Sequence, residues 1–230
     1  MADGPGPFVT RLRYRLPDGH LLEWTSRSHR KGHGRSLGTW IAVLFMVGST
    51  CFAVGSVAGY STLVGARADA VTYFVGSLFF TSASALQLAA TPREQRADWW
   101  ACVIQLAGTL FFNISTFDAM NDALDTAAEN RLVWTPDVFG SICFLVASWL
   151  AYSVRRRARH DSDWWIAVVN LAGSVAFGVS AVAAFVVPST GTELDLAAAN
   201  WTTSLGAAGF LAGALLMMRS PQGEVAVSPQ

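Results

Sequence analysis

The chain has 230 residues, of which 52% are hydrophobic and 14% are charged, and its net charge at pH 7 is zero. This composition is too apolar for an ordinary soluble domain and is typical of a polytopic membrane protein. Cys51, Cys102 and Cys143 all fall in apolar runs, without paired spacing or a nearby histidine, so we expect neither a disulfide framework nor a metal site.

Residues 1–36 precede the first apolar run and are expected to form a cytoplasmic N-terminal segment. Between about residues 10 and 26, two stretches that alternate with period two flank a Pro-Asp-Gly turn at residues 17–19, which predicts a short β-hairpin. A solvated tail with incidental alternation is the alternative interpretation. The register that separates an apolar face from an arginine-rich face pairs Tyr14 with Leu22, Leu12 with Trp24 and Arg13 with Glu23.

Six uncharged apolar runs follow, each about 17 to 29 residues long. At about 1.5 Å per residue, a helix of that length crosses a hydrocarbon core of about 30 Å. A transmembrane β-barrel would need segments of about ten residues with alternating polarity, whereas these runs are continuous. The sequence therefore predicts an all-α, polytopic membrane protein with six transmembrane helices, at residues 37–60, 70–90, 99–117, 138–154, 164–192 and 196–218.

Each apolar run carries one copy of the motif Gly-(Ser/Thr/Ala)-x-x-Phe. Successive copies begin 28, 32, 32, 33 and 33 residues apart, so one membrane-crossing unit recurs along the chain. Helices in lipid associate through close backbone approach at small residues, so we expect the motif glycines to be helix-packing contacts. The glycines are Gly48, Gly76, Gly108, Gly140, Gly173 and Gly206, and the phenylalanines are Phe52, Phe80, Phe112, Phe144, Phe177 and Phe210.

A longer repeat overlies the short motif. Trp-Ile-Ala-Val at residues 40–43 recurs at residues 165–168, and Asp-Trp-Trp at residues 98–100 recurs at residues 163–165. The odd-numbered runs therefore resemble one another, and the repeating unit is a helical hairpin. We expect three tandem hairpins, at residues 37–92, 93–158 and 159–219, in a pseudo-threefold bundle, followed by a disordered cytoplasmic tail at residues 220–230.

Basic residues concentrate on one side of the predicted membrane. Fourteen of the 16 lie in the N-terminal segment, in the connections between runs two and three and between runs four and five, or after run six. The positive-inside rule then places both termini in the cytoplasm, and the preference for arginine over lysine indicates a bacterial source and its inner membrane. Because orientation explains the basic clusters, we expect them to bind anionic lipid headgroups rather than nucleic acid. The headgroup-binding residues are Arg30, Lys31, Arg35, Arg155, Arg156, Arg157 and Arg159.

Paired helices that carry Gly-Ser-x-x-Phe resemble the YrhK-like family of small bacterial membrane proteins, whose function is uncharacterised. The resemblance rests on Gly48-Ser49 and Phe52 with Gly76-Ser77 and Phe80, and on the two later copies of this motif pair. It covers most of residues 38–219. It implies a membrane-embedded helical hairpin. Three copies in one chain depart from the single hairpin of that family, and no functional residue is carried over from it.

The third run has the most polar face. Four of its polar residues fall within an arc of about 80°, and the fifth run repeats two of them at equivalent positions. Such residues either form hydrogen bonds between helices or line a small pocket or narrow path. In the second case we expect a ligand-lining site that opens to the outside between the third and fifth helices, formed by Gln105, Thr109, Asn113, Thr116, Asn170 and Ser174.

The sequence contains no Gly-x-Ser-x-Gly, His-Glu-x-x-His or glycine-rich phosphate motif. The runs also carry no ionisable residue near the membrane centre, which argues against proton-coupled transport. We therefore expect a non-catalytic integral membrane module without a cofactor, which binds lipids, a protein partner or a second copy of itself as a scaffold or regulator. The alternative is a channel or facilitator for a small polar solute through the helix bundle.

Overall fold

The computed structural model describes residues 2–3, 11–15, 21–25, 31–121, 123–156 and 161–219. The chain divides into two compact units, Met1–Gly38 and Thr39–Gln230. The boundary between them falls at the start of the first apolar run. The predicted turn at residues 17–19 and the predicted tail at residues 220–230 lie outside the described residues.

The first unit contains a small antiparallel sheet. β2 (Arg11–Arg15) pairs with β3 (Leu21–Thr25), and β1 (Ala2–Asp3) pairs with the other edge of β2. The third strand was not predicted, because two residues are too few to show a period. The register of β2 and β3 is the predicted one, with Leu12 opposite Trp24, Arg13 opposite Glu23 and Tyr14 opposite Leu22.

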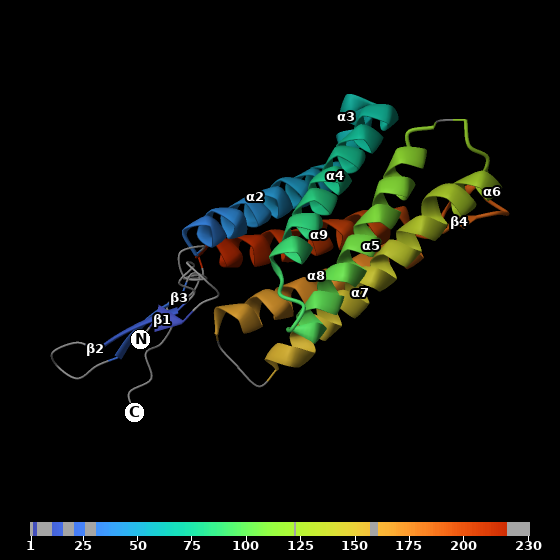
Figure 1. The fold of residues 1–230 in the computed structure, drawn as a ribbon. Coiled ribbons are helices and arrows are strands. Elements are labelled where there is room, and N and C mark those ends of the chain that lie inside the picture. The colour runs from blue at the N-terminus through green and yellow to red at the C-terminus, as the bar shows by residue number, and fades with distance from the viewer. Residues whose placement is uncertain are drawn as a thin grey trace. The chain divides into compact units, whose positions relative to one another are not determined.

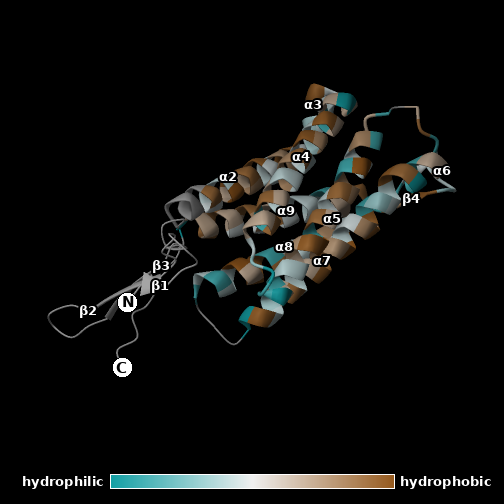
Figure 2. Ribbon diagram, viewed as in Figure 1, coloured by the Kyte–Doolittle hydropathy of each residue, from teal (hydrophilic) through white to brown (hydrophobic). Residues whose placement is uncertain are grey.

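Six long helices account for most of the described chain (Figure 1). All six are long and apolar enough to cross a membrane, so the six predicted helices are confirmed and are compatible with a multi-pass membrane protein. Figure 2 shows hydrophobic residues along these helices and hydrophilic residues mainly at their ends and connections. The helices are α2 (Lys31–Gly55), α4 (Ala66–Ala90), α5 (Arg96–Asp118), α7 (Thr135–Arg155), α8 (Ser162–Ala183) and α9 (Leu196–Arg219).

Two predicted runs are longer than the helices they contain. α2 ends at Gly55 rather than at residue 60, and the short helix α3 (Tyr60–Val64) lies between two glycines with left-handed φ angles, Gly59 at 87° and Gly65 at 90°. Glycine adopts this backbone without steric strain, so the chain can turn sharply on both sides of α3. α8 ends at Ala183 rather than at residue 192, because β4 (Val186–Val187) and β5 (Thr192–Glu193) form a hairpin there.

A π-helical segment holds the β4–β5 hairpin. α6 (Thr126–Glu129), the π-helix η1 (Asn130–Trp134) and α7 form one continuous run of 30 residues. The Asn130 side-chain amide donates to the Val186 carbonyl at 2.7 Å and accepts from the Val186 N–H at 3.1 Å. The Trp134 indole N–H donates to the Ala181 carbonyl at 2.8 Å. Side chains from both ends of the wider π-turn therefore bind the end of α8 and the strand that follows it.

The long helices form a closed ring in sequence order. α4 packs on α5, α5 on α7, α7 on α8, and α8 on α9. α2 closes the ring, because Gly48 lies against Gly76 of α4 and the Ser56 hydroxyl, directly after α2, is 2.7 Å from the Ser204 hydroxyl of α9. We call the end of the ring where α4 finishes and α5 begins the proximal end. The opposite end, which carries α3 and the β4–β5 hairpin, is the distal end.

Candidate functional site

The six motif phenylalanines meet at the centre of the ring. The side chains of Phe52, Phe112 and Phe177, from α2, α5 and α8, contact one another with ring centroids 6.0 to 6.2 Å apart. Those of Phe80, Phe144 and Phe210, from α4, α7 and α9, form a second triangle with separations of 5.3 to 6.1 Å. None of the six is more than 6% exposed. We call this group the phenylalanine core.

The two triangles of the phenylalanine core are also joined to each other. Phe52 contacts Phe80 at 5.5 Å, Phe112 contacts Phe144 at 5.2 Å, and Phe177 contacts Phe210 at 5.6 Å. These separations lie in the range of favourable aromatic packing, where each pair contributes about 0.5 to 1.5 kcal/mol beyond its burial. The arrangement fills the centre of the ring at this level with apolar side chains.

The motif glycines lie at close contacts between the two helices of a pair. A Cβ atom on Gly108 would stand 3.1 Å from the Gly140 carbonyl oxygen and 3.0 Å from the Phe144 ring, and a Cβ on Gly140 would meet Gly108 and Phe112 at 3.1 and 3.0 Å. Gly48 with Gly76, and Gly173 with Gly206, show the same arrangement, each glycine facing the phenylalanine of its partner helix. Backbone contact within the pairs α2–α4, α5–α7 and α8–α9 thus depends on the motif glycines, which have no side chain.

Hydroxyl groups join one helix pair to the next. Ser77 of α4 lies 3.0 Å from Thr116 of α5, Ser148 of α7 lies 2.8 Å from Ser174 of α8, and Ser204 of α9 lies 2.7 Å from Ser56. Short hydroxyl side chains can satisfy one another in an apolar medium without separating the helices. Contacts between neighbouring helix pairs therefore include pairs of hydroxyl groups, whereas the contacts within each helix pair depend on glycine.

The packing face extends beyond the motif. The residue eight positions after each motif glycine is small, and all six are buried. Eight residues are slightly more than two helical turns, so this position lies on the same face as the motif. A search at that spacing would have found the residues: Ser56, Ser84, Thr116, Ser148, Ala181 and Ala214.

The four predicted ligand-lining residues of α5 lie along its contact with α4. The Gln105 amide donates to the Ser84 hydroxyl at 3.4 Å, and Thr116 lies against Ser77. The Asn113 side chain, with its amide nitrogen turned toward α4, reaches the Ser77 hydroxyl at 2.8 Å. Thr109 is fully buried, and its hydroxyl donates to the backbone of its own helix. The polar face of α5 thus forms hydrogen bonds between helices.

The two predicted residues of α8 lie against other helices. Ser174 faces Ser148 of α7, and the Asn170 amide oxygen occupies the space that a side chain on Gly213 of α9 would need. The six predicted residues therefore lie at three helix contacts, α4 with α5, α7 with α8 and α8 with α9, rather than at a contact of α5 with α8. The physical reason is the ring order, in which α7 lies between α5 and α8.

Two polar residues that the sequence analysis did not select face the distal side of the phenylalanine core. Tyr73 of α4 and Asp137 of α7 each precede the core phenylalanine of their helix by seven residues, so each lies on the same helix face as that ring. The Tyr73 ring contacts Phe52 with ring centroids 5.3 Å apart, and a Cβ on Gly55 would stand 2.7 Å from the same ring. Asp137 stood just outside the predicted uncharged run, whereas the structure places it inside an apolar helical span.

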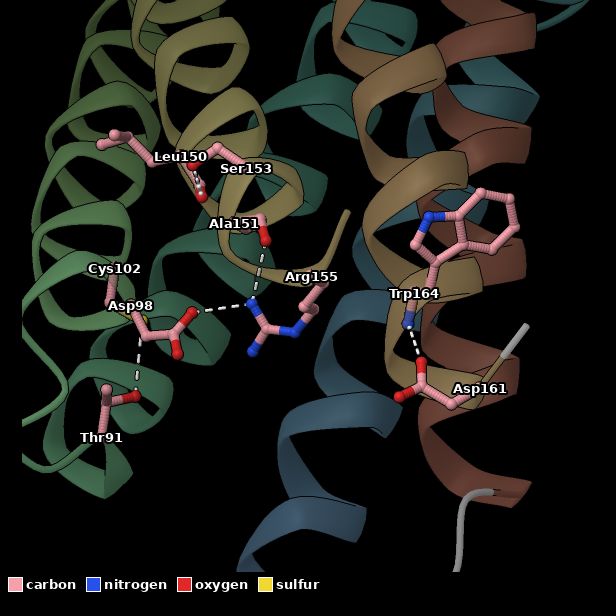
Figure 3. A network of polar contacts seen from close by, with 9 residues as sticks. All are labelled: Thr91, Asp98, Cys102, Leu150, Ala151, Ser153, Arg155, Asp161 and Trp164. Atoms are coloured by element: carbon pink, nitrogen blue, oxygen red, sulfur yellow. Dashed lines mark hydrogen bonds and ion pairs between the residues drawn. The ribbon is translucent and has the colours of Figure 1, made fainter. Parts of the chain in front are cut away.

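An ion pair joins α5 and α7 at the proximal end (Figure 3). The Arg155 guanidinium donates to the Asp98 carboxylate at 2.7 Å and to the Ala151 carbonyl at 3.0 Å. Both side chains are partly buried, with exposed fractions of 29% for Arg155 and 21% for Asp98. Arg155, predicted to bind headgroups, thus has a protein partner. In the same network, the Cys102 thiol lies 3.4 Å from the Thr91 hydroxyl.

The other predicted headgroup-binding residues are divided between the described helices and the part of the chain that is not described. Arg156 is exposed directly after α7, and Lys31 and Arg35 belong to α2. Arg30, Arg157 and Arg159 lie outside the described residues. The Asp161 side chain accepts from the Trp164 N–H at 2.7 Å and so caps the start of α8, as an N-cap aspartate does (Figure 3).

Comparisons of the chain with protein-family models, with curated proteins and with solved structures found no match. The resemblance to the YrhK-like family stays a prediction based on the motif. Within the part of the chain that the structure describes, no group of three or more His, Cys, Asp or Glu side chains is arranged to hold a metal ion.

Proposed function

We propose that the chain is a non-catalytic integral membrane module made of three tandem helical hairpins around a pseudo-threefold axis. The two phenylalanine triangles support this arrangement, because equivalent residues from the odd-numbered and even-numbered spans each form a set of three mutual contacts. The repeated glycine contacts within the helix pairs support the hairpin as the unit. Parallel repeats with an axis along the membrane normal are a known way to build such bundles.

The observation that carries the functional proposal is the filled centre of the ring. A path for a polar solute along the axis must pass the phenylalanine core, where each ring contacts three or more others and is almost fully buried. Moving a polar solute through such a layer carries the cost of losing its hydrogen bonds. A scaffold or regulator, which binds lipids, a protein partner or a second copy, needs no such path.

The distribution of charge supports an orientation with the proximal end in the cytoplasm. Arginines gather there, at positions 93, 96, 155, 156 and 219, whereas the distal connections carry acidic residues such as Asp125, Glu193 and Asp195. The exposed Arg156 beside the end of α7 is well placed for anionic headgroups, each such contact being worth about 1 kcal/mol. We propose the inner membrane of a bacterium as its location, because the chain prefers arginine over lysine.

A channel or facilitator is the second candidate. Polar residues on both sides of the phenylalanine core favour it: Gln105 and Asn170 lie toward the proximal end, and Tyr73 and Asp137 toward the distal end. Conduction would require the phenylalanine core to open.

Flux measurements on proteoliposomes separate the two functions. We expect wild-type liposomes to release glycerol, urea and K⁺ at the rate of protein-free liposomes, and a pore-forming peptide serves as the positive control. Wild-type flux well above background, slowed when Phe112 is replaced by tryptophan, contradicts the module and supports conduction. The matched control is Phe111→Trp, because Phe111 contacts Phe139 and lies outside the phenylalanine core.

A further inference from the structure

Three interfaces join neighbouring helix pairs: α4–α5, α7–α8 and α9–α2. A short connection, residues 91–95, links α4 directly to α5, and another, residues 156–161, links α7 to α8. The chain does not link α9 to α2 in this way, because α2 is the first and α9 the last of the six long helices. The α9–α2 interface is therefore held by noncovalent contacts alone.

The two connected interfaces carry several hydrogen bonds besides the hydroxyl contacts described above. At α4–α5, the amides of Gln105 and Asn113 bind serine hydroxyls of α4 at 3.4 and 2.8 Å. At α7–α8, the Trp134 indole donates to the Ala181 carbonyl at 2.8 Å. Hydrogen bonds are one of the few forces that hold helices together in lipid. Separation of either interface would thus break several of them.

Ser49, the motif serine of α2, has no such partner. Its side chain is fully buried, and its hydroxyl forms no hydrogen bond with any described residue. The equivalent serine of α8, Ser174, lies 2.8 Å from Ser148 of α7. The residue of α9 that corresponds to Ser148 is Ala214, which has no hydroxyl. A buried hydroxyl without a partner is unfavourable, so this side chain does not stabilise the closed ring.

The lack of a partner reflects a longer apolar stretch of α9. Residues 205–218 of α9 contain no hydroxyl, amide or charged side chain, whereas the equivalent residues 75–88 of α4 include three serines, a threonine and a glutamine. Lipid acyl chains are as apolar as this stretch, so no hydrophobic force favours α2 over lipid as its neighbour. Contact of α2 with this part of α9 depends on packing alone.

Three contacts keep the first and third helix pairs together. The Ser56 and Ser204 hydroxyls lie 2.7 Å apart, Phe52 contacts Phe177 with ring centroids 6.0 Å apart, and Phe80 contacts Phe210 at 5.8 Å. These contacts make the closed ring the resting state. They are also the contacts that must break when the α9–α2 interface opens.

We propose that the ring opens laterally between α9 and α2, and that an acyl chain of a membrane lipid then occupies this interface. Lipid is the occupant because the bilayer surrounds the ring and the α9 stretch offers only apolar atoms. The other two interfaces keep their hydrogen bonds during the opening. The inference rests on the membrane location of the proposed module, and it specifies where that module binds lipid.

Labelling of buried cysteines in liposomes tests the opening. Ser49, Thr109 and Ser174 hold the same motif position in the three odd-numbered spans, and all three are 0% exposed. Each is replaced by cysteine in a background without the natural cysteines. We expect N-phenylmaleimide, which dissolves in the bilayer, to label Ser49→Cys about tenfold faster than Thr109→Cys and Ser174→Cys, because local opening governs access. Equal rates at the three positions overturn the proposal.

The contact between Ser56 and Ser204 provides matched controls. Ser204→Ala should speed labelling of Ser49→Cys, whereas Ser148→Ala, at the α7–α8 interface, should not. A disulfide formed by Ser56→Cys with Ser204→Cys should slow labelling to the rate of the other two positions, and reduction should restore it. Fast labelling that neither change affects shows entry through another interface and overturns the proposal. A rate that rises with the protein-to-lipid ratio identifies a second copy rather than lipid as the occupant, and also overturns it.

Thermal unfolding in detergent checks the state of the Ser49 hydroxyl. We expect Ser174→Ala, which removes a hydrogen bond, to lower the Tm by about 2 °C, and Ser49→Ala to leave it unchanged or higher. An equal loss in both variants shows that Ser49 is bonded in the closed ring and contradicts the inference. Solute flux does not enter these tests. Their failure leaves the proposed module standing, and flux through the wild type would contradict the module without deciding whether the interface opens.

Discussion

A side chain at the first motif position would enter the neighbouring helix. At Gly173, a Cβ would stand 2.9 Å from the Gly206 carbonyl oxygen, which belongs to backbone and cannot rotate away. Gly178 lies on the same helix, and a Cβ there would meet nothing within 4 Å. The two glycines therefore have different roles, although both are small residues in an apolar span.

We predict that Gly173→Leu destabilises the protein by about 2 kcal/mol or more, because overpacking forces α8 and α9 apart. Gly178→Leu is the matched control and should leave stability unchanged or slightly higher, since leucine favours helix more than glycine does. Thermal unfolding in detergent measures both. Equal stability of the two variants would show that the close helix approach at Gly173 contributes nothing.

The phenylalanine core gives a second prediction at the scale of single residues. Phe52, Phe112 and Phe177 are equally buried and make equivalent contacts, so replacing any one by alanine should cost a similar amount, about 3 to 5 kcal/mol. Phe111→Ala should cost clearly less, because Phe111 is less buried than its neighbour. A large difference among the three core variants in chemical unfolding would contradict the proposed threefold equivalence.

At the scale of the helix, contacts within pairs and between pairs use different chemistry. α5 shows both, because one of its faces carries Gly108 against α7 and another carries Gln105 and Asn113 against α4. A hydrogen bond between membrane helices contributes about 0.6 kcal/mol on average, which is less than the loss of close backbone packing. The polar face of α5 therefore fixes the register of α4 and α5 more than it stabilises their contact.

We predict that Asn113→Leu lowers stability by no more than about 1 kcal/mol and leaves folding yield unchanged. Loss of ligand binding or of liposome flux in a variant that folds normally would instead support the ligand-lining role expected from the sequence. Thr50→Leu is a suitable control, because the Thr50 hydroxyl is exposed and bonds only to its own helix among the described residues.

The proximal ion pair gives a further prediction for α5 and α7. Because Asp98 and Arg155 are partly buried, their coupling in a double-mutant cycle should be about 1 kcal/mol and should weaken with salt. Asp163 occupies the equivalent place at the start of α8, but the described residues give it no ion pair, so Asp163→Ala should show no coupling to Arg155. A coupling of zero for Asp98 and Arg155 would show that the ion pair does not stabilise the contact between α5 and α7.

For the whole molecule, orientation in the membrane is the most direct prediction. The proposed topology places Glu94, in the connection between α4 and α5, in the cytoplasm, and Thr190, in the β4–β5 hairpin, outside. In a background without the natural cysteines, we expect an impermeant thiol reagent to label Thr190→Cys but not Glu94→Cys in intact cells. The reverse labelling pattern would invert the topology, and both positions should react after the membrane is permeabilised.

The sequence by itself was enough for the six apolar helices, the strand register of residues 11–25 and the positions of the motif glycines. These features depend on local periodicity and on run length, which a single sequence displays directly. It did not reveal where α2 and α8 end, because apolar residues continue into α3 and into the β4–β5 hairpin. There the conformation of Gly59 and Gly65, and the pairing of β4 with β5, override hydropathy.

Only the tertiary structure decided what each polar side chain faces. Gln105 and Asn113 formed the most conspicuous polar stripe, yet they bond to α4, whereas Tyr73, which no sequence pattern singled out, packs its ring against Phe52 of α2. A helical period states which residues share a face, but not which neighbour that face meets. That neighbour follows from the order of helices in the ring, which depends on contacts between residues far apart in the chain.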